Sequence, residues 1–322
     1  MAKVSVIIPV YNVEKYLERC LNSLLNQKFK DYELVIVNDG SPDNSQAIID
    51  KYVKKYPKKI RAFKKENGGI STARNFGLKN IKSEYVTFVD SDDYVHENFL
   101  KSMYDKIVSD DYDFVVCDLV LAYPDGKLER KSSLFEKDLT TPKEIKEKMH
   151  DFYPIVANKM YKTELITDDN LFHEGVLYED VEFMYRLFSK VKKIGVVDEG
   201  LYYYYQNSTS IMHTFNKRLY NYVDNWNYIF DYYKEKDIFT QYKDVLEYSF
   251  VRYTYATFLK RATNFAYDDY LDALNYAITE VKKKTSKRYL NKYYYRSFKG
   301  LYLLLFNKPL GILLYKFMRR KG

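Results

Sequence analysis

Residues 85–95 read YVTFVDSDDYV, an apolar run that ends in three carboxylates within four positions. The residues from Tyr85 to Val89 are aromatic or β-branched without strict alternation, which is typical of a parallel strand buried on both faces. Asp90, Asp92 and Asp93 follow at once, and crowded carboxylates repel one another unless a cation or hydrogen-bond donors compensate them. The compensating partner is either the next helix, predicted over residues 96–108, which Asp93 or a neighbouring residue could cap, or a bound ligand.

Strands and helices alternate on both sides of this stretch. We predict strands at residues 4–9, 33–37, 60–64 and 85–89, and helices after residue 13, over 42–56 and over 71–80. Ser41 and Pro42 form a typical N-cap and first-turn pair for the second helix. This βαβαβαβ order predicts an α/β fold, a mostly parallel sheet with helices on both faces.

Polar or ring side chains follow three of the predicted strands. Tyr11 and Asn12 come after the first strand, Asn38 and Asp39 after the second, and the three aspartates after the fourth. In open parallel sheets, ligands bind beyond the carboxyl ends of the strands, so we expect these groups to share one ligand site. Strand one ends in PVYN, which is neither a dinucleotide fingerprint nor a P-loop. Oxygen-rich ligands favour Mg²⁺ or Mn²⁺ over zinc.

Charge is distributed unevenly along the 322 residues. The chain carries a net charge of +8, but residues 281–322 contain thirteen Lys or Arg and no acid, so the rest is net negative. Cys20 and Cys117 lie far apart and are interpreted as small core residues in a reducing compartment. No stretch reaches the roughly 20 apolar residues that a spanning helix needs, and the N-terminal run, with its proline, is expected to be a strand rather than a leader.

Five motifs in order resemble family 2 of the nucleotide-sugar glycosyltransferases, which have the GT-A fold. The motifs are SVIIPVYN, VNDGSPDNS, ENGGISTARNFG, FVDSDDY and LYEDVEF, and the resemblance covers about residues 3–215. It implies a catalytic domain over residues 1–215, with a nucleotide-binding half at about 1–105 and an acceptor-binding half at about 106–215. Residues 216–322 would form a helical region with a basic amphipathic tail.

The resemblance implies a donor site for a UDP-sugar. Its residues would be Pro9, Tyr11, Asn12, Asp39, Asn67, Gly68, Gly69, Arg74, Asp90 and Ser91. Asp39 would accept a hydrogen bond from uracil, the two glycines would let the backbone approach the nucleotide, and Arg74 would contact the base or diphosphate. Asp92 would hold a divalent cation, Mn²⁺ or Mg²⁺, against both phosphates. Without the motifs, Tyr11 is equally a packed aromatic and Arg74 a surface residue beside a turn.

The resemblance also implies a catalytic base. In LYEDVEF it makes Asp180 the base that takes a proton from the acceptor hydroxyl, supported by Glu179, in a single displacement that inverts the anomeric carbon. Acids at a helix N-terminus otherwise serve as complements to the helix dipole, which favours their ionised form. His213 lies where relatives sometimes carry a histidine near the metal, although a lone histidine is more often an ordinary surface or core residue.

The basic tail mixes Lys and Arg with Leu, Phe and Tyr, which predicts either a helix lying on an anionic membrane or one packed on the catalytic domain. We expect a cytoplasmic protein, peripheral on the inner face of the plasma membrane, with a lipid-linked saccharide acceptor in bacterial surface polysaccharide assembly and no nucleic-acid partner. The alternatives are an inactive nucleotide- or saccharide-binding module of the same fold, and a nucleotidyltransferase, which would require a basic glycine-rich loop after strand one.

Overall fold

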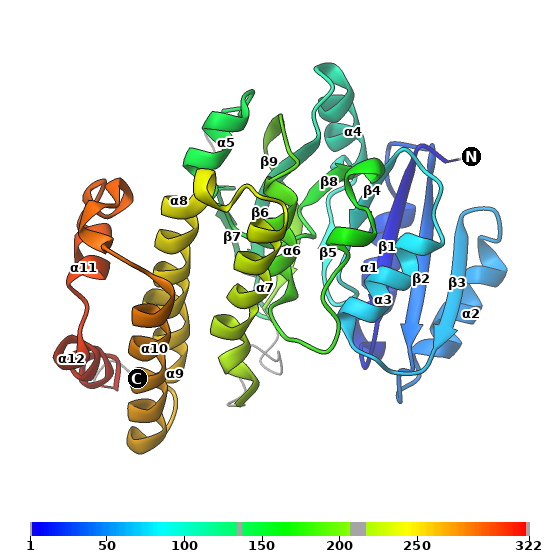
Figure 1. Ribbon diagram of the computed structural model, residues 1–322. Helices are drawn as coiled ribbons and strands as arrows, with labels where there is room; N and C mark the ends of the chain where they lie inside the picture. Colours follow the sequence, from blue (N-terminus) through cyan, green and yellow to red (C-terminus); the bar gives the residue numbers. More distant parts are fainter. Residues whose placement is uncertain (1, 134–136, 207–216, 320–322) are drawn as a thin grey trace. The chain divides into compact units, whose positions relative to one another are not determined.

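The computed structural model describes residues 2–133, 137–206 and 217–319, which fall into two compact units (Figure 1). Unit 1 comprises Met1–Gly175 and Glu179–Ser210, and unit 2 comprises Val176–Tyr178 and Ile211–Gly322. The helices of unit 1 are α1 (Glu14–Leu25), α2 (Ser45–Lys55), α3 (Ile70–Lys79), α4 (Phe99–Ser109), α5 (Pro142–Lys148) and α6 (Glu179–Phe188). Its strands are β1 (Val4–Val10), β2 (Tyr32–Asp39), β3 (Ile60–Lys65), β4 (Tyr85–Phe88), β5 (Tyr94–Val95), β6 (Phe114–Ala122), β7 (Leu128–Lys131), β8 (Lys159–Lys162) and β9 (Ile194–Tyr205).

The strands form one sheet in the order β3-β2-β1-β4-β8-β6-β9-β5, and β7 pairs with the C-terminal half of β6. Pairing is parallel from β3 to β4 and between β6 and β9, whereas β8 runs antiparallel to both of its neighbours. The predicted α/β sheet with helices on both faces is confirmed, but its parallel part is limited to these two groups of strands.

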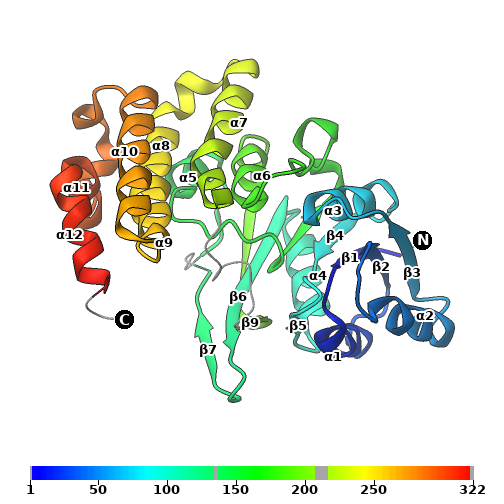
Figure 2. The ribbon, with the colours of Figure 1, turned by 90° about the horizontal axis from the view of Figure 1, so that it is seen from below.

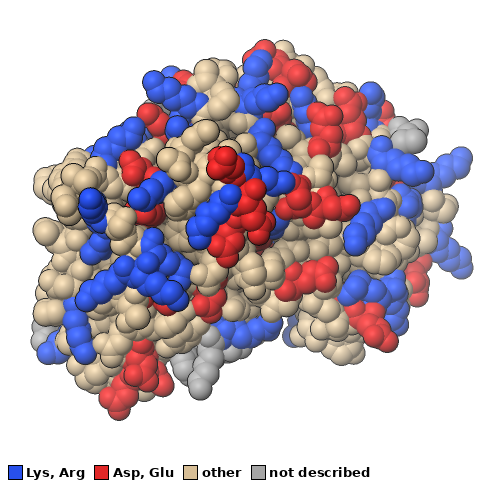
Figure 3. All heavy atoms as spheres, viewed as in Figure 1, with Lys and Arg blue, Asp and Glu red and all other residues tan. Residues whose placement is uncertain are grey.

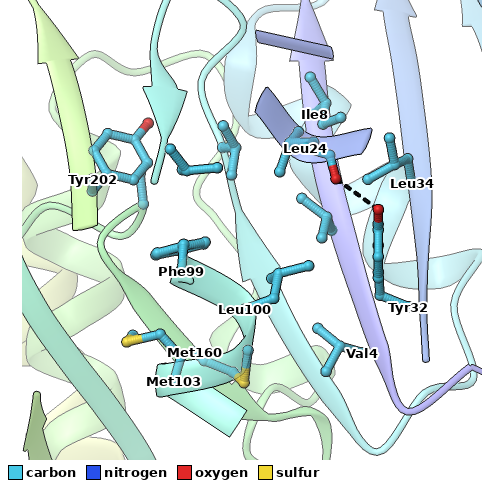
Figure 4. Close-up of a cluster of buried hydrophobic side chains, with 14 of the residues drawn as sticks. Val4, Ile8, Leu24, Tyr32, Leu34, Phe99, Leu100, Met103, Met160 and Tyr202 are labelled. Atoms are coloured by element: carbon cyan, nitrogen blue, oxygen red, sulfur yellow. Dashed lines mark hydrogen bonds between the residues drawn. The ribbon is translucent and has the colours of Figure 1, made fainter. Parts of the chain in front are cut away.

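Every residue of β1 is buried, so the sheet is covered on both faces at this strand. Successive side chains point to opposite faces. Val4 and Ile8 join the core beneath α1, α2 and α4 (Figure 4), where the Tyr32 hydroxyl donates to the Leu24 carbonyl at 2.7 Å. On the other face, a Cβ added at Gly77 of α3 would lie 2.6 Å from Ile7, so this glycine permits the close approach of helix and strand seen in Figure 2.

Two predictions about helix starts are wrong. The second helix, α2, begins at Ser45 instead of Pro42, because Ser41 is held in a turn where its amide donates to Asn38 Oδ1 and its hydroxyl donates to Asp43. The helix predicted from residue 96, α4, begins only at Phe99, and the capping alternative fails because the buried Asp93 carboxylate accepts hydrogen bonds elsewhere. The prediction that both cysteines are core residues is confirmed, because both are buried and unpaired.

Unit 2 is helical. Its helices are α7 (Asn221–Glu235), α8 (Phe239–Arg252), α9 (Leu259–Ala262), α10 (Tyr267–Lys284), α11 (Phe298–Leu305) and α12 (Lys308–Arg319), with a π-helical turn at Tyr253–Phe258. Trp226 is fully buried and contacts the rings of Phe230, Phe250 and Tyr253. Within the described residues no single helix is long and apolar enough to cross a membrane. The pair α11 and α12, bent by 120°, meets the criterion together by length and composition only.

Candidate functional site

Three strand ends meet at one edge of the sheet in unit 1. β1 pairs in parallel with β2 on one side and β4 on the other, with Val10 opposite Asn38 and Ile7 opposite Phe88. The segments that follow these strands therefore emerge together, as predicted from the sequence. Pro9 is buried within β1, whereas the ring of Tyr11 beyond it is 50% exposed.

Asn12 lies in the turn after β1 with a φ of 56°, a left-handed conformation in which asparagine is less strained than most residues. Its backbone N–H donates to the Ser41 hydroxyl at 2.8 Å. Because Ser41 is itself bonded to Asn38, the turns after β1 and β2 are tied together. This network fixes the backbone around the exposed Tyr11 ring.

The Asp39 carboxylate organises the loop before α3. One oxygen accepts from Lys65 Nζ at 2.5 Å and from the Gly68 amide at 3.1 Å, and the other from the Gly69 amide at 2.8 Å and Asn67 Nδ2 at 3.2 Å. A carboxylate offers about four lone-pair sites, so these four donors occupy all of them. A ligand that donates to Asp39 must therefore displace one of the two side-chain donors.

Gly69 is the residue before the first turn of α3, and its φ of 92° is one that other residues rarely adopt. A Cβ built there would meet no atom within 4 Å, so the backbone at the start of α3 faces open space. The open backbone is that of Gly69 alone, because a Cβ added at Gly68 would lie 2.7 Å from Thr72 Oγ1.

Arg74 connects the two carboxylate groups predicted from the sequence. Its side chain is 2% exposed; Nη2 donates to Asp90 Oδ1 at 2.9 Å, and Nη1 donates to Glu179 Oε1 at 2.8 Å and to Asp180 Oδ1 at 2.7 Å. These contacts bring the segment after β4 and the first turn of α6 to the guanidinium of one residue of α3. Three carboxyl groups thus share one buried cation.

Burial raises the pKa of both Glu179 and Asp180, and the charge of Asp180 further raises that of Glu179. Arg74 opposes both shifts, and a hydrogen bond between the two carboxyl groups raises the pKa of Glu179 while it lowers that of Asp180. The expected effect of the helix N-terminus is thus outweighed by desolvation. Asp180 is the member of the pair that keeps its negative charge to the lower pH.

Asp92 is the carboxylate for which the motifs predict a bound cation. Burial, followed by the charge of Asp90, raises its pKa to about 6. The neighbouring Ser91 is buried, and Arg19 Nη2 donates to the Asp92 carbonyl at 2.6 Å, which fixes the loop. In the part of the chain that the structure describes, no three His, Cys, Asp or Glu gather as a metal site, and His213 lies outside those residues. A hard cation would fit here with Asp92 and diphosphate oxygens as ligands.

Two residues of this site were not predicted from the sequence. The Tyr202 hydroxyl donates to Asp93 at 2.7 Å and accepts from the Asp90 amide at 3.1 Å, and the Tyr205 amide donates to Asp93 at 2.8 Å. Asp93 thus anchors the aspartate loop to β9. Lys65 is the second, because it neutralises Asp39. The tyrosine run in β9 was the one available signal for Tyr202, and it gave no indication of a partner.

The chain is similar to known glycosyltransferases. Residues 5–169 match the family described as Glycosyl transferase family 2. The minor teichoic acid biosynthesis protein GgaA of Bacillus subtilis is 35% identical over 258 residues, or 76% of this chain and 56% of GgaA. The uncharacterised glycosyltransferase EpsJ of the same organism is 35% identical over 215 residues, or 65% of this chain and 62% of EpsJ. The chain thus spans about three fifths of the length of these two relatives.

A solved structure extends the likeness. The chain aligns with Staphylococcus aureus TarS 1–349 in complex with UDP-GlcNAc with a TM-score of 0.70 and 26% identity, over 87% of this chain and 81% of that one. The TarS structure thus shares the fold of this chain. The resemblance found in the sequence is confirmed, and the chain belongs to glycosyl transferase family 2.

Proposed function

We propose that the protein is a metal-dependent, inverting glycosyltransferase that moves a sugar from a UDP-sugar to a hydroxyl of a saccharide acceptor. One observation carries the proposal: the guanidinium of Arg74 touches both Asp90, at the nucleotide end of the site, and Asp180, the candidate base. An inverting transfer needs a donor site and a base close together, because acceptor oxygen and anomeric carbon must meet in one step.

The donor side rests on the groups around Asp39. Uracil would donate its N–H to the Asp39 carboxylate in place of Lys65 or Asn67, with Tyr11 and Asn12 beside the ring. The loop of Asn67, Gly68 and Gly69 would approach the nucleotide through its backbone, and Asp90 and Ser91 would face the ribose. The likeness to TarS in complex with UDP-GlcNAc supports a uridine nucleotide and a hexosyl or N-acetylhexosaminyl group.

The chemistry divides between the two carboxylate groups. Asp92 would hold Mn²⁺ or Mg²⁺, and a cation there supplies stabilisation of the charge that develops on the departing diphosphate. Asp180 would accept the proton of the acceptor hydroxyl as its oxygen attacks. Arg74 holds the Asp180 carboxylate in position, and Glu179, the more readily protonated neighbour, limits the negative charge beside it.

The acceptor is proposed from the relatives and from unit 2. GgaA is named for minor teichoic acid biosynthesis and TarS as a poly(ribitol-phosphate) transferase, which favours a cell-surface polymer or its lipid-linked precursor as acceptor. Along α11, Phe298, Leu301, Tyr302 and Leu305 form an exposed apolar stripe at the spacing of one helix face. Such a stripe with basic neighbours suits the surface of an anionic membrane on the cytoplasmic side.

Basic residues gather in the same unit. Lys282, Lys287 and Arg288 line a surface groove of about 350 Å³ beyond the end of α10, together with Thr285, Tyr289 and Leu304. Figure 3 shows the Lys and Arg side chains gathered in this part of the surface. This charge would attract lipid headgroups to the side of unit 2 that carries it.

The direct test is release of UDP from UDP-GlcNAc and related UDP-sugars in the presence of Mn²⁺ and short polyol-phosphate or lipid-linked saccharide acceptors. The proposal expects acceptor-dependent UDP release and a product whose anomeric configuration, read by NMR, is opposite to that of the donor. A retained configuration would contradict the mechanism. Nucleotide binding without turnover for any donor would favour an inactive binding module.

A further inference from the structure

The chain leaves unit 1 for three residues just before the candidate base. Val176–Tyr178 belong to unit 2, and Glu179 and Asp180 follow directly as the first residues of α6 in unit 1. Two consecutive Cα–Cα steps separate Tyr178 from Asp180, a span of at most about 7.6 Å. Whatever fixes Tyr178 therefore acts within two peptide units of the base.

Helix α7 binds the backbone of this segment. Asn221 Oδ1 accepts from the Leu177 amide at 3.3 Å. Asn225 Nδ2 donates to the Leu177 carbonyl at 2.8 Å and to the Tyr178 carbonyl at 3.4 Å. Asn225 is 1% exposed, so these bonds are shielded from water. Two asparagines one helical turn apart thus form hydrogen bonds with the backbone of two consecutive residues.

The side chain of Tyr178 is held as well. Its ring stacks on Tyr222 of α7 with centroids 3.6 Å apart and an interplanar angle of 26°. The Arg261 guanidinium lies 5.6 Å from the Tyr178 ring centroid and 5.0 Å from that of Tyr222. Stacked rings beneath a guanidinium are attracted to it through their π faces.

The backbone of Tyr178 is strained. Its φ is 65°, a left-handed conformation that is costly for a large residue and that persists only where the surroundings impose it. The contacts from α7 supply such surroundings. The strained residue is thus held by α7 directly before the first residue of α6.

We infer that α7, through Asn225 and Tyr222, orients the Asp180 carboxylate for proton transfer by fixing the Leu177–Tyr178 backbone ahead of it. This inference rests on the proposed role of Asp180 as the base. Asn225 and Tyr222 are positioning residues, since they act on Asp180 through the chain. A displacement of about 1 Å in a catalytic group can reduce turnover about 100-fold, so loss of this contact should appear in kcat.

The test uses Asn225→Asp, which keeps the side-chain shape but replaces the amide donor by an oxygen facing two carbonyls. Its matched control is Asn227→Asp on the exposed face of the same helix. We expect Asn225→Asp to lower kcat at least tenfold, with the donor KM and the Kd for UDP within twofold of the wild-type values. Asn227→Asp should leave all three unchanged. Packing damage alone would lower the melting temperature without this division between kcat and KM.

A second pair of variants covers the case in which Asn225→Asp does not fold. Tyr222→Ala should lower kcat in the same way, whereas Tyr222→Phe, which keeps the stacked ring, should have the kcat of the wild type. Wild-type kcat in folded Asn225→Asp and Tyr222→Ala, while Asp180→Asn is inactive, would overturn this inference alone. Wild-type activity in Asp180→Asn would overturn the assignment of the base and this inference with it.

Discussion

Arg74 and Asp180 form an ion pair of 2.7 Å although 106 positions separate them in the sequence. The same guanidinium holds Asp90 at 2.9 Å, so the end of β4 and the start of α6 are joined through one buried cation. Arg74 had been expected at the base or diphosphate of the nucleotide. Nothing tests that prediction, and the observed contacts add that Arg74 joins the candidate base to the aspartate at the end of β4.

Asp180→Asn should abolish most of the transfer. An amide cannot accept the acceptor proton, and a positioned general base contributes roughly 10²- to 10⁴-fold to a rate. We expect kcat to fall by a factor in that range and the Kd for UDP to stay within threefold, because the proposed contact with uracil is at Asp39 and not at Asp180. Asp198→Asn, at a side chain that is 93% exposed, is the control and should match the wild type. A wild-type kcat in Asp180→Asn would contradict the assignment of Asp180 as the base.

Arg74→Met should destabilise the fold. Removing one partner of a buried ion pair leaves uncompensated carboxylates and costs about 3–5 kcal/mol. Urea unfolding at pH 7 measures this loss. The matched control is Arg61→Met, which breaks the exposed pair with Glu33 and should cost less than about 1 kcal/mol. Equal losses in the two variants would contradict the buried cluster.

Glu179→Gln should stabilise the protein increasingly as the pH rises. The pKa of Glu179 is raised in the folded state, from an ordinary 4.5, chiefly by burial and then by Asp180. A carboxyl with a raised folded pKa contributes stability that is complete below the unfolded value and is lost as the pH rises through the folded one. Glutamine keeps the neutral form throughout.

Melting temperatures between pH 4 and pH 8.5 therefore test this assignment. We expect the variant and the wild type to differ least near pH 4 and the variant to gain on the wild type steadily above pH 4.5. A difference that does not change with pH would show that Glu179 titrates as an ordinary carboxyl group.

Asp39→Asn should weaken the binding of UDP. The amide loses acceptor capacity and turns an N–H₂ group towards the amides of Gly68 and Gly69. Hydrogen bonds to charged groups contribute roughly 1.5–3 kcal/mol, so the Kd measured by calorimetry should rise about 10- to 100-fold. Asp50→Asn, exposed on α2, is the control. An unchanged Kd in Asp39→Asn would show that the nucleotide binds away from this loop.

Phe298→Glu with Leu305→Glu should reduce binding to vesicles that contain phosphatidylglycerol. These side chains are 92% and 67% exposed on α11, and burying them in the interface would contribute part of the affinity. Cosedimentation should fall at least fivefold for the double variant and remain unchanged for Val108→Glu on α4. If the wild type does not sediment with such vesicles, the membrane is not the partner of this stripe.

Local sequence patterns were sufficient for the first half of the sheet. The run from Val4 to Val10 and the turns after β1, β2 and β4 predicted which segments would emerge at one edge of the sheet, because parallel neighbours end at the same edge. The antiparallel insertion of β8 between β4 and β6 was not predicted, because its four residues, Lys159–Lys162, show no periodicity.

The tertiary contacts of charged residues could not be predicted from the sequence. The pairing of Arg74 with Asp180, and of Asp93 with Tyr202, depends on how segments about a hundred positions apart come together. The helix N-terminus suggested a readily ionised Asp180, but burial of the pair raised its pKa, and the extent of burial becomes visible only in three dimensions.

The most direct measurement is a thermal-shift titration of UDP, GDP, CMP and dTDP, with and without Mn²⁺, on the wild type and on Asp92→Asn. A ligand at 100 times its Kd stabilises the fold by about 2.7 kcal/mol, which raises the melting temperature measurably. We predict a shift for UDP that Mn²⁺ enlarges in the wild type and does not enlarge in Asp92→Asn. No shift with UDP, or an equal effect of Mn²⁺ in both proteins, would contradict a metal-dependent uridine nucleotide site at Asp92.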